Sequence, residues 1–344
     1  MLALLNPIGD NHHVEKILFC GLGLIGRQRL NSTLALGFKP QDLYFLDPGL
    51  QSPAQFTDQG LKRVNSIQEA LGEGVSKAIV AMPHHLAFST IQKLLECQVK
   101  VLAEKPPGRN LSETALLCGM QNSNLLSIGF NYRHMPGIIK LKELLASNYF
   151  GEVHTIKMQL GHGGSPDDAK SWKLDPNSAG GGALLDPGIH LLDLLIFLTD
   201  LSSDDFTVVG SRFWSGFWNT GIEEQFFGLL ESKNCLVSID SSIVRWKTSF
   251  TIEIVGRDGY AIVTGRGRSD GPQIMRVGKR WAWLSGKSQV EEEEVFSFGY
   301  GDNSIAFETK LWFENESSIP SIFDAYHSMQ LEEAFRNHAN AFKI

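Results

Sequence analysis

The first part of the chain alternates short apolar runs with helical patterns, from Val14 to about Arg133. Continuous apolar strands that alternate with amphipathic helices are typical of a parallel sheet covered on both faces. The pattern predicts strands at Lys16–Cys20, Leu43–Leu46, Ala78–Ala81, Val99–Ala103 and Leu125–Phe130, and helices at Ile25–Leu36, Ser66–Leu71, His85–Cys97 and Ser112–Met120.

The pattern changes after a predicted helix at Pro136–Asn148. Strand patterns now follow one another with few helical signals between them, which favours an antiparallel sheet. Gly256-Arg257-Asp258-Gly259 between two of them is a hairpin signal. The predicted strands are Val153–Leu160, Phe206–Phe213, Gln225–Leu230, Cys235–Ile239, Phe250–Val255 and Tyr260–Thr264, and the predicted helices are Leu184–Leu198 and Phe323–Phe342.

These two patterns predict an α/β protein of two domains. An N-terminal domain with a parallel sheet covers residues 14–133, and a C-terminal α+β domain with a large, mainly antiparallel open sheet covers residues 134–344. Residues 1–13 are expected to form a leader, in which His12 and His13 are not taken as metal ligands, and no metal site is expected elsewhere.

Composition and charge narrow the functional classes. The net charge of −7 argues against a nucleic-acid partner, because phosphate binding needs a basic surface. No apolar run approaches the roughly 20 residues that span a bilayer. The N-terminus lacks the basic region and cleavage site of a signal peptide, and the four cysteines form no C-x-x-C pair. These features favour a cytoplasmic protein with reduced thiols.

Gly21-Leu22-Gly23-Leu24-Ile25-Gly26 is a G-x-G-x-x-G motif between a predicted strand and a predicted helix. Its glycines permit a tight turn, a close approach of a pyrophosphate and close packing of helix on strand, and the helix N-terminus binds the pyrophosphate. Asp47 ends the second predicted strand, where a carboxylate accepts hydrogen bonds from the adenosine ribose. The motif therefore predicts a Rossmann domain that binds NAD. NADP is less favoured because a carboxylate repels its 2′-phosphate.

Two further motifs carry candidate chemistry. Glu104-Lys105-Pro106 follows a strand at its carboxyl end, where open α/β sheets bind ligands. Asp186 and His190 are four residues apart, which would place them on one face of a helix as a proton-transfer pair. The alternative is equally open from these residues alone: Asp186 caps a helix before Pro187, and His190 is a histidine of the core.

These motifs together resemble the glucose–fructose oxidoreductase, inositol dehydrogenase and rhizopine-catabolism (Gfo/Idh/MocA) family. The resemblance covers nearly the whole chain. It rests on Gly21–Gly26, Met82-Pro83-His84-His85, Glu104-Lys105-Pro106, Asn131-Tyr132-Arg133, Trp172 and the GGALLDPGIHLLDLL stretch with Asp186 and His190. Pro187 departs from the family pattern and predicts that the helix starts later or bends.

The resemblance implies roles for these residues. Lys105 would lie beside the nicotinamide and the substrate hydroxyl, and Asp186 and His190 would form the catalytic pair. His190 or Lys105 would act as the base. Further contacts to the cofactor are expected at Met82, Pro83, His84, Glu104, Asn131 and Trp172. Substrate contacts are expected at Tyr132, Arg133 and His162, although packing at a domain interface would explain Tyr132 and Arg133 equally well.

The expected activity is transfer of a hydride between NAD(H) and a hydroxyl or keto carbon of a sugar, a nucleotide sugar or a sugar-like polyol. Two alternatives stay open: a non-catalytic sensor that binds NAD, and an NAD-using enzyme that cleaves glycosides. The open face of the second sheet predicts a homodimer or homotetramer.

Overall fold

The computed structural model describes residues 15–164, 170–279 and 293–341. The predicted leader 1–13 and the predicted end of the last helix at Phe342 lie outside the described residues. Within the described residues, no helix is long and apolar enough to cross a membrane.

The chain forms two compact units. Unit 1 contains the residues up to Asn131 together with Asn303–Tyr326, and unit 2 contains Tyr132–Asp302 and the residues from His327 onward. The division after Asn131 lies close to the predicted boundary. The assignment of Asn303–Tyr326 to the C-terminal domain is wrong, because the chain returns to unit 1 over this segment.

Unit 1 contains a six-stranded parallel sheet in the order β3-β2-β1-β4-β5-β6. Its strands are β1 (Ile17–Cys20), β2 (Leu43–Leu46), β3 (Lys62–Arg63), β4 (Lys77–Val80), β5 (Lys100–Glu104) and β6 (Leu126–Gly129). Its helices are α1 (Leu24–Ala35), α2 (Ala54–Thr57), α3 (Ile67–Gly72), α4 (His84–Glu96), α5 (Leu111–Cys118) and α9 (Ser304–Phe313). The Rossmann-type sheet predicted from the sequence is thus confirmed.

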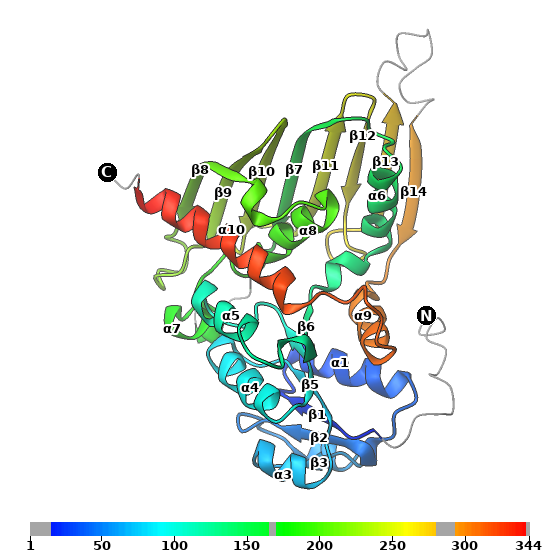
Figure 1. Cartoon of the computed structure of the whole chain (residues 1–344), viewed down its shortest axis with the longest axis vertical. Helices are drawn as coiled ribbons and strands as arrows, with labels where there is room; N and C mark the ends of the chain where they lie inside the picture. The colour runs from blue at the N-terminus through cyan, green and yellow to red at the C-terminus, as the bar shows by residue number, and fades with distance from the viewer. Residues whose placement is uncertain (1–14, 165–169, 280–292, 342–344) are drawn as a thin grey trace. The chain divides into compact units, whose positions relative to one another are not determined.

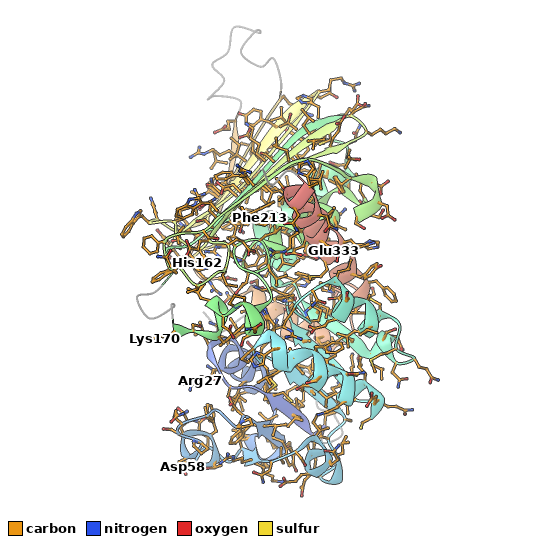
Figure 2. The ribbon with its side chains drawn as sticks, turned by 90° about the vertical axis from the view of Figure 1, so that its left-hand side faces the viewer. Arg27, Asp58, His162, Lys170, Phe213 and Glu333 are labelled. Carbon is orange, nitrogen blue, oxygen red and sulfur yellow. The ribbon has the colours of Figure 1, made fainter. Side chains whose placement is uncertain are left out.

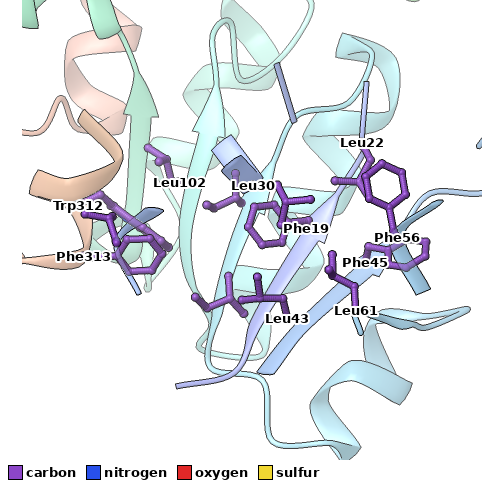
Figure 3. Close-up of a cluster of buried hydrophobic side chains, with 13 residues drawn as sticks. Phe19, Leu22, Leu30, Leu43, Phe45, Phe56, Leu61, Leu102, Trp312 and Phe313 are labelled. Carbon is purple, nitrogen blue, oxygen red and sulfur yellow. The ribbon is translucent and has the colours of Figure 1, made fainter. Parts of the chain in front are cut away.

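The core of unit 1 includes side chains from Asn303–Tyr326, the segment that returns to this unit. Trp312 and Phe313 of α9 belong to the same buried cluster as Phe19 of β1 and Leu102 of β5 (Figure 3). Helix α9 also packs along α1. The returning segment therefore completes the hydrophobic core on one face of the parallel sheet.

Unit 2 contains an eight-stranded sheet in the order β14-β13-β12-β11-β7-β10-β9-β8. All of its pairings are antiparallel except that of β7 with β10, so the expected mainly antiparallel sheet is confirmed. The strands are β7 (Val153–Gly161), β8 (Thr207–Trp214), β9 (Gln225–Ser232), β10 (Cys235–Ser242), β11 (Ser249–Gly256), β12 (Gly259–Thr264), β13 (Gln273–Lys279) and β14 (Glu294–Gly299).

Helices cover one face of this sheet (Figure 1). They are α6 (Pro136–Ala146), α8 (Ile189–Thr199) and the part of α10 (Ile322–Ala341) that belongs to unit 2, and the short α7 (Pro176–Ala179) precedes α8. Strand β9 shows the two faces: Phe226 is buried against Phe335 of α10, whereas Phe227 and Leu229 are half-exposed on the opposite face. The alternation follows from the two-residue period of a strand.

Candidate active site

The glycine loop between β1 and α1 has the geometry that its motif predicts. Gly21 has a φ of +90°, and a Cβ atom there would lie 2.4 Å from the carbonyl oxygen of Ala81. A Cβ atom on Gly26 would lie 2.1 Å from the carbonyl oxygen of Gly21. At Gly23, by contrast, a Cβ atom would meet nothing within 4 Å. The loop thus leaves open space at the N-terminus of α1, where unpaired N–H groups favour an anion such as a pyrophosphate.

Asp47 follows β2 and is tied to this loop. Its Oδ2 atom accepts a hydrogen bond from the backbone N–H of Leu22 at 2.8 Å, and Oδ1 accepts one from Gly49 at 3.0 Å. Each carboxylate oxygen has a second lone pair, so the group can still accept bonds from ribose hydroxyls. The residues therefore fit a dinucleotide.

Arg27 lies on α1 beside the glycine loop (Figure 2). Its Nε atom donates to the carbonyl oxygen of Leu22 at 2.9 Å. Its guanidinium lies over the ring of Phe56, 5.5 Å from the centroid. The sequence analysis did not single out this arginine.

The other predicted residues of unit 1 lie at the same edge of the sheet. Met82 follows β4, and its Cγ atom would be 3.1 Å from a Cβ atom on Gly21. Pro83 precedes α4, which begins with the buried His84. Lys105 directly follows β5, and Asn131 directly follows Phe130 after β6. Because the carboxyl ends of parallel strands meet at one edge, the fold gathers these residues beside the glycine loop.

Asn131 and Glu104 have partners within unit 1. The Nδ2 atom of Asn131 donates to the hydroxyl of Ser304 at 2.6 Å. Glu104 accepts from Nε of Arg29 at 2.9 Å and pairs with its Nη2 at 2.7 Å. Arg29 is fully buried and also pairs with Glu308 of α9. Glu104 is thus held in a buried ion cluster directly before Lys105, and its predicted contact with the cofactor stays a prediction.

The arrangement of Asp186 differs from the prediction. Helix α8 begins only at Ile189, after Gly188 as its N-cap, so Asp186 lies in the turn before the helix. Both predictions for Asp186, that it shares a helix face with His190 and that it caps the helix, are therefore wrong. The later helix start that Pro187 predicted is confirmed. The carboxylate of Asp186 forms an ion pair with Lys173, with 3.0 Å between Nζ and Oδ2. The side chain of Lys173 is half-exposed.

His190 is the second residue of α8 and is buried. Its imidazole stacks on the ring of Tyr132, with ring centroids 3.8 Å apart. One turn further along the helix, Asp193 accepts hydrogen bonds from Nε of Arg133 on both carboxylate oxygens, at 3.1 and 2.9 Å. Arg133 is therefore an ion-pair partner of α8, and Tyr132 is a packing partner of His190.

His162 and Trp172 lie at one end of the sheet of unit 2. His162 follows β7 (Figure 2), and its backbone N–H and C=O pair with Ser242 and Arg245. Trp172 packs on a buried cluster that contains Ala183 and Ile222. Trp172 belongs to unit 2, whereas the other predicted cofactor residues belong to unit 1.

The sequence analysis also missed three further groups of residues. Asp193 had a signal, because an aspartate within an apolar helix three residues after His190 needs a buried partner. Lys173 follows Trp172 but shows no spacing that relates it to Asp186. Arg29 and Glu308 are 279 positions apart, and no local pattern connects them.

Comparison with known families matches both parts of the chain. Residues 15–128 match the oxidoreductase family with an NAD-binding Rossmann fold, and residues 138–262 match the GFO/IDH/MocA C-terminal domain. A glucose-6-phosphate 3-dehydrogenase of Bacillus subtilis is 26% identical over 94% of this chain and 95% of its own length. A putative UDP-kanosamine synthase oxidoreductase subunit of Amycolatopsis mediterranei is 28% identical over 58% of this chain, which spans 57% of that protein.

Solved structures show the same fold. A levoglucosan dehydrogenase in complex with NADH and levoglucosan has a TM-score of 0.78 at 16% identity and covers 95% of this chain and 97% of its own. The 3-ketoreductase KijD10 of Actinomadura kijaniata, in complex with NADP and TDP-benzene, has a TM-score of 0.76 at 16% identity and covers 97% and 98%. Since these relatives carry NADH or NADP, the preference for NAD stays a prediction. The two family matches, together with the glycine loop and the two-unit fold, show that the chain belongs to the Gfo/Idh/MocA family of NAD(P)-binding oxidoreductases.

Proposed function

We propose that this protein is an NAD(H)-dependent dehydrogenase or reductase that acts on a hydroxyl or keto carbon of a sugar or nucleotide sugar. The observation that carries the proposal is the set of groups at the carboxyl edge of the parallel sheet: the open glycine loop, the anchored carboxylate of Asp47 and the amine of Lys105. The sugar is inferred from the relatives, whose names include glucose 6-phosphate, levoglucosan and UDP-kanosamine.

The roles of the side chains follow from the chemistry of alcohol oxidation. The bound cofactor supplies the acceptor or donor of the hydride. The protein must then remove a proton from the hydroxyl oxygen and hold that oxygen in place. We propose His190 as the base, with Lys105 donating a hydrogen bond to the same oxygen. The opposite assignment, with Lys105 as the base, is the alternative that the variants below also test.

Asp186 has a different role in this proposal from the one its spacing suggested. Its carboxylate pairs with Lys173 at 3.0 Å in the turn before α8. A charged pair in which the side chain of Lys173 is half-exposed can bind hydroxyls as donor and acceptor at once. We therefore propose that Asp186 and Lys173 orient the substrate hydroxyls and that His190 performs the proton transfer.

The test measures NADH formation at 340 nm with purified protein, NAD and a panel of levoglucosan, glucose 6-phosphate, a methyl glucoside, UDP-glucose and myo-inositol. We expect stoichiometric NADH with at least one of these compounds. An NAD-binding sensor would give no reaction, and a glycoside-cleaving enzyme would release the aglycone without net NADH. Either result would contradict the proposal.

Lys105→Ala and His190→Ala should each lower turnover by roughly 10²–10⁴-fold, the usual contribution of a positioned proton-transfer group. Neither variant should much weaken NAD binding, because the glycine loop and Asp47 hold the dinucleotide. Lys93→Ala on α4 and His154→Ala on β7 are the matched controls and should keep normal turnover. Near-normal turnover of the folded His190→Ala protein would show that His190 is structural.

A further inference from the structure

The imidazole of His190 lies flat against the phenol ring of Tyr132. The ring centroids are 3.8 Å apart and the ring planes differ by only 4°. Both residues are buried, with 5% of His190 and 8% of Tyr132 exposed. At this distance the two rings are in van der Waals contact, so a tilt of the imidazole would bring its atoms into the phenol. The contact therefore restricts the imidazole to one plane.

The ring of Tyr132 is itself fixed from two other sides. Phe250 of β11 meets it edge-on, with centroids 5.8 Å apart and an angle of 88°. Arg266, in the loop after β12, donates from Nη1 to the Tyr132 hydroxyl. Arg266 is in turn paired with the buried Asp270, with 2.6 Å between Nε and Oδ2. The plane of the imidazole is thus connected to a rigid strand and to a buried ion pair.

This arrangement goes beyond the roles that the sequence assigned. Tyr132 was expected to bind substrate or to pack at a domain interface, and Arg266 had no expected role. Within unit 2, the Tyr132 ring contacts both the imidazole of His190 and Phe250 of β11, and Arg266 bonds to its hydroxyl. Stacking fixes the plane of an imidazole but not which nitrogen carries the proton, because both neutral tautomers are flat rings of the same shape. Hydrogen bonds to the ring nitrogens determine the tautomer.

We propose that Tyr132, whose ring packs edge-on against Phe250, is a positioning residue that sets the plane of the His190 imidazole for proton transfer, an inference that rests on the proposed function. The flat contact, rather than the Tyr132 hydroxyl, fixes the base. A misplacement of a catalytic group by about 1 Å costs up to roughly 100-fold in rate, so loss of the ring should lower kcat far more than it raises KM.

Turnover of substitution variants tests the proposal, with the sugar of the panel that wild-type protein oxidises fastest. Tyr132→Leu should lower kcat by roughly 10- to 100-fold with KM for the sugar changed less than about threefold. Tyr132→Phe keeps the ring and removes only the hydroxyl, so its kcat should stay within about threefold of wild type. Tyr149→Leu removes another partly buried tyrosine of unit 2, which contacts Phe150 and Lys279, and should leave kcat unchanged.

A double-mutant cycle separates positioning from general damage. Once His190 is replaced by alanine, no imidazole remains to be positioned. Tyr132→Leu should therefore cause no further loss of kcat in the His190→Ala background. An equal fold-loss in both backgrounds would overturn the positioning role, as would a kcat of Tyr132→Leu equal to that of wild type.

A spectroscopic readout needs no substrate. In protein labelled with ¹³C at histidine Cε1, the ring current of the stacked phenol should shift the Cε1–H proton of His190 upfield, and His190→Ala identifies this resonance. Tyr132→Leu should move it downfield, and Tyr132→Phe should leave it in place. An unmoved resonance in Tyr132→Leu would overturn the proposal.

The variants distinguish a failure of the proposed function from a failure of the positioning role. If His190→Ala keeps normal turnover, the base is wrongly assigned. If His190→Ala loses turnover but Tyr132→Leu keeps it, only the positioning role is wrong.

Discussion

The buried ion cluster of unit 1 offers the sharpest test of the structural reasoning. Arg29 on α1 is 0% exposed, and so is the side chain of Glu308 on α9. The guanidinium also donates to the carbonyl oxygen of Ile305 at 3.2 Å and to the hydroxyl of Thr309 at 3.0 Å. Together with Glu104 and Glu308, these acceptors satisfy all five of its N–H donors. Methionine in place of Arg29 would leave two carboxylates close together without a cation.

The expected loss of stability follows from that arrangement. Removing one partner of a buried ion pair costs about 3–5 kcal/mol, because an uncompensated charge remains in the interior. For a domain of this size each kcal/mol lowers the midpoint of thermal unfolding by about 2–4 °C. Arg29→Met should therefore lower the free energy of unfolding by about 3–5 kcal/mol and the midpoint by roughly 6–20 °C. Urea unfolding followed by circular dichroism measures the first quantity, and a thermal scan the second.

Two comparisons separate the buried charge from other effects of the substitution. Arg109→Met removes a partly exposed arginine that precedes α5 and pairs with Glu113 four residues later, and it should cost less than about 1 kcal/mol. Arg29→Met combined with Glu308→Met removes one of the uncompensated carboxylates and should be more stable than Arg29→Met alone. If Arg29→Met unfolds within about 1 kcal/mol of wild type, or the double variant is the less stable one, the buried charge is not what couples α9 to α1.

Three further expectations concern other parts of the molecule. Asp47→Ser removes the carboxylate that repels a 2′-phosphate, so the ratio of the NADP to the NAD dissociation constant should fall by roughly tenfold; equal affinities in the wild type would contradict this. Phe227 and Leu229 are 54% and 51% exposed on the open face of the second sheet, and we expect this face to form a homo-oligomer interface. Leu229→Lys should then give a smaller species by light scattering, and a wild-type monomer at micromolar concentration would refute the interface. Burial raises the pKa of Glu332 from 4.5 to about 7 against the opposing effect of Arg336. The folded state thus binds the proton of the Glu332 carboxyl more tightly than the unfolded state does. The stability that this proton contributes is fully present below pH 4.5 and is lost as the pH rises through 7. The unfolding free energy of Glu332→Gln relative to wild type should consequently rise with pH over this window, by up to about 3 kcal/mol, and a constant difference in urea unfolding would contradict it.

The sequence predicted those elements whose hydrophobic positions repeat regularly along the chain or whose turn carries a local signal. The apolar strands of unit 1 and the alternating strands from β7 to β12 were found because their burial repeats along the chain. The hairpin at Gly256–Gly259 joins β11 and β12, as its turn signal predicted. The pair Lys62–Arg63 was missed because β3 has only two residues and both are exposed. Strand β14 was missed for a similar reason: most of its positions are exposed or half-buried, so it has no apolar run.

Helix α9 was missed for a different reason. Its buried residues include Glu308 and Thr309 next to Trp312 and Phe313, so the burial pattern does not match the hydrophobic pattern. A glutamate in the core is stable only with a partner, and that partner, Arg29, belongs to a helix near the other end of the chain. A local reading therefore assigns this segment to the nearer domain.

The candidate site shows the same limit at Asp186. A Cβ atom on Gly182, the last glycine of the run at 180–182, would lie 1.9 Å from the carbonyl oxygen of Glu223. The N–H of Gly182 donates to the carboxylate of Glu223 at 2.7 Å, and Arg336 of α10 pairs with the same carboxylate at 2.6 Å. The glycine is required by close packing, and the turn that carries Asp186 is held by an ion pair from elsewhere in the chain. The assignment of these residues to the site stays a prediction. The local geometry of the turn depends on distant partners, because Glu223 is 41 positions from Gly182 and 113 positions from Arg336. The helical spacing rule for Asp186 and His190 failed for this reason. The contacts of Gly182 hold the preceding residues in a turn, and the helix begins only at Ile189.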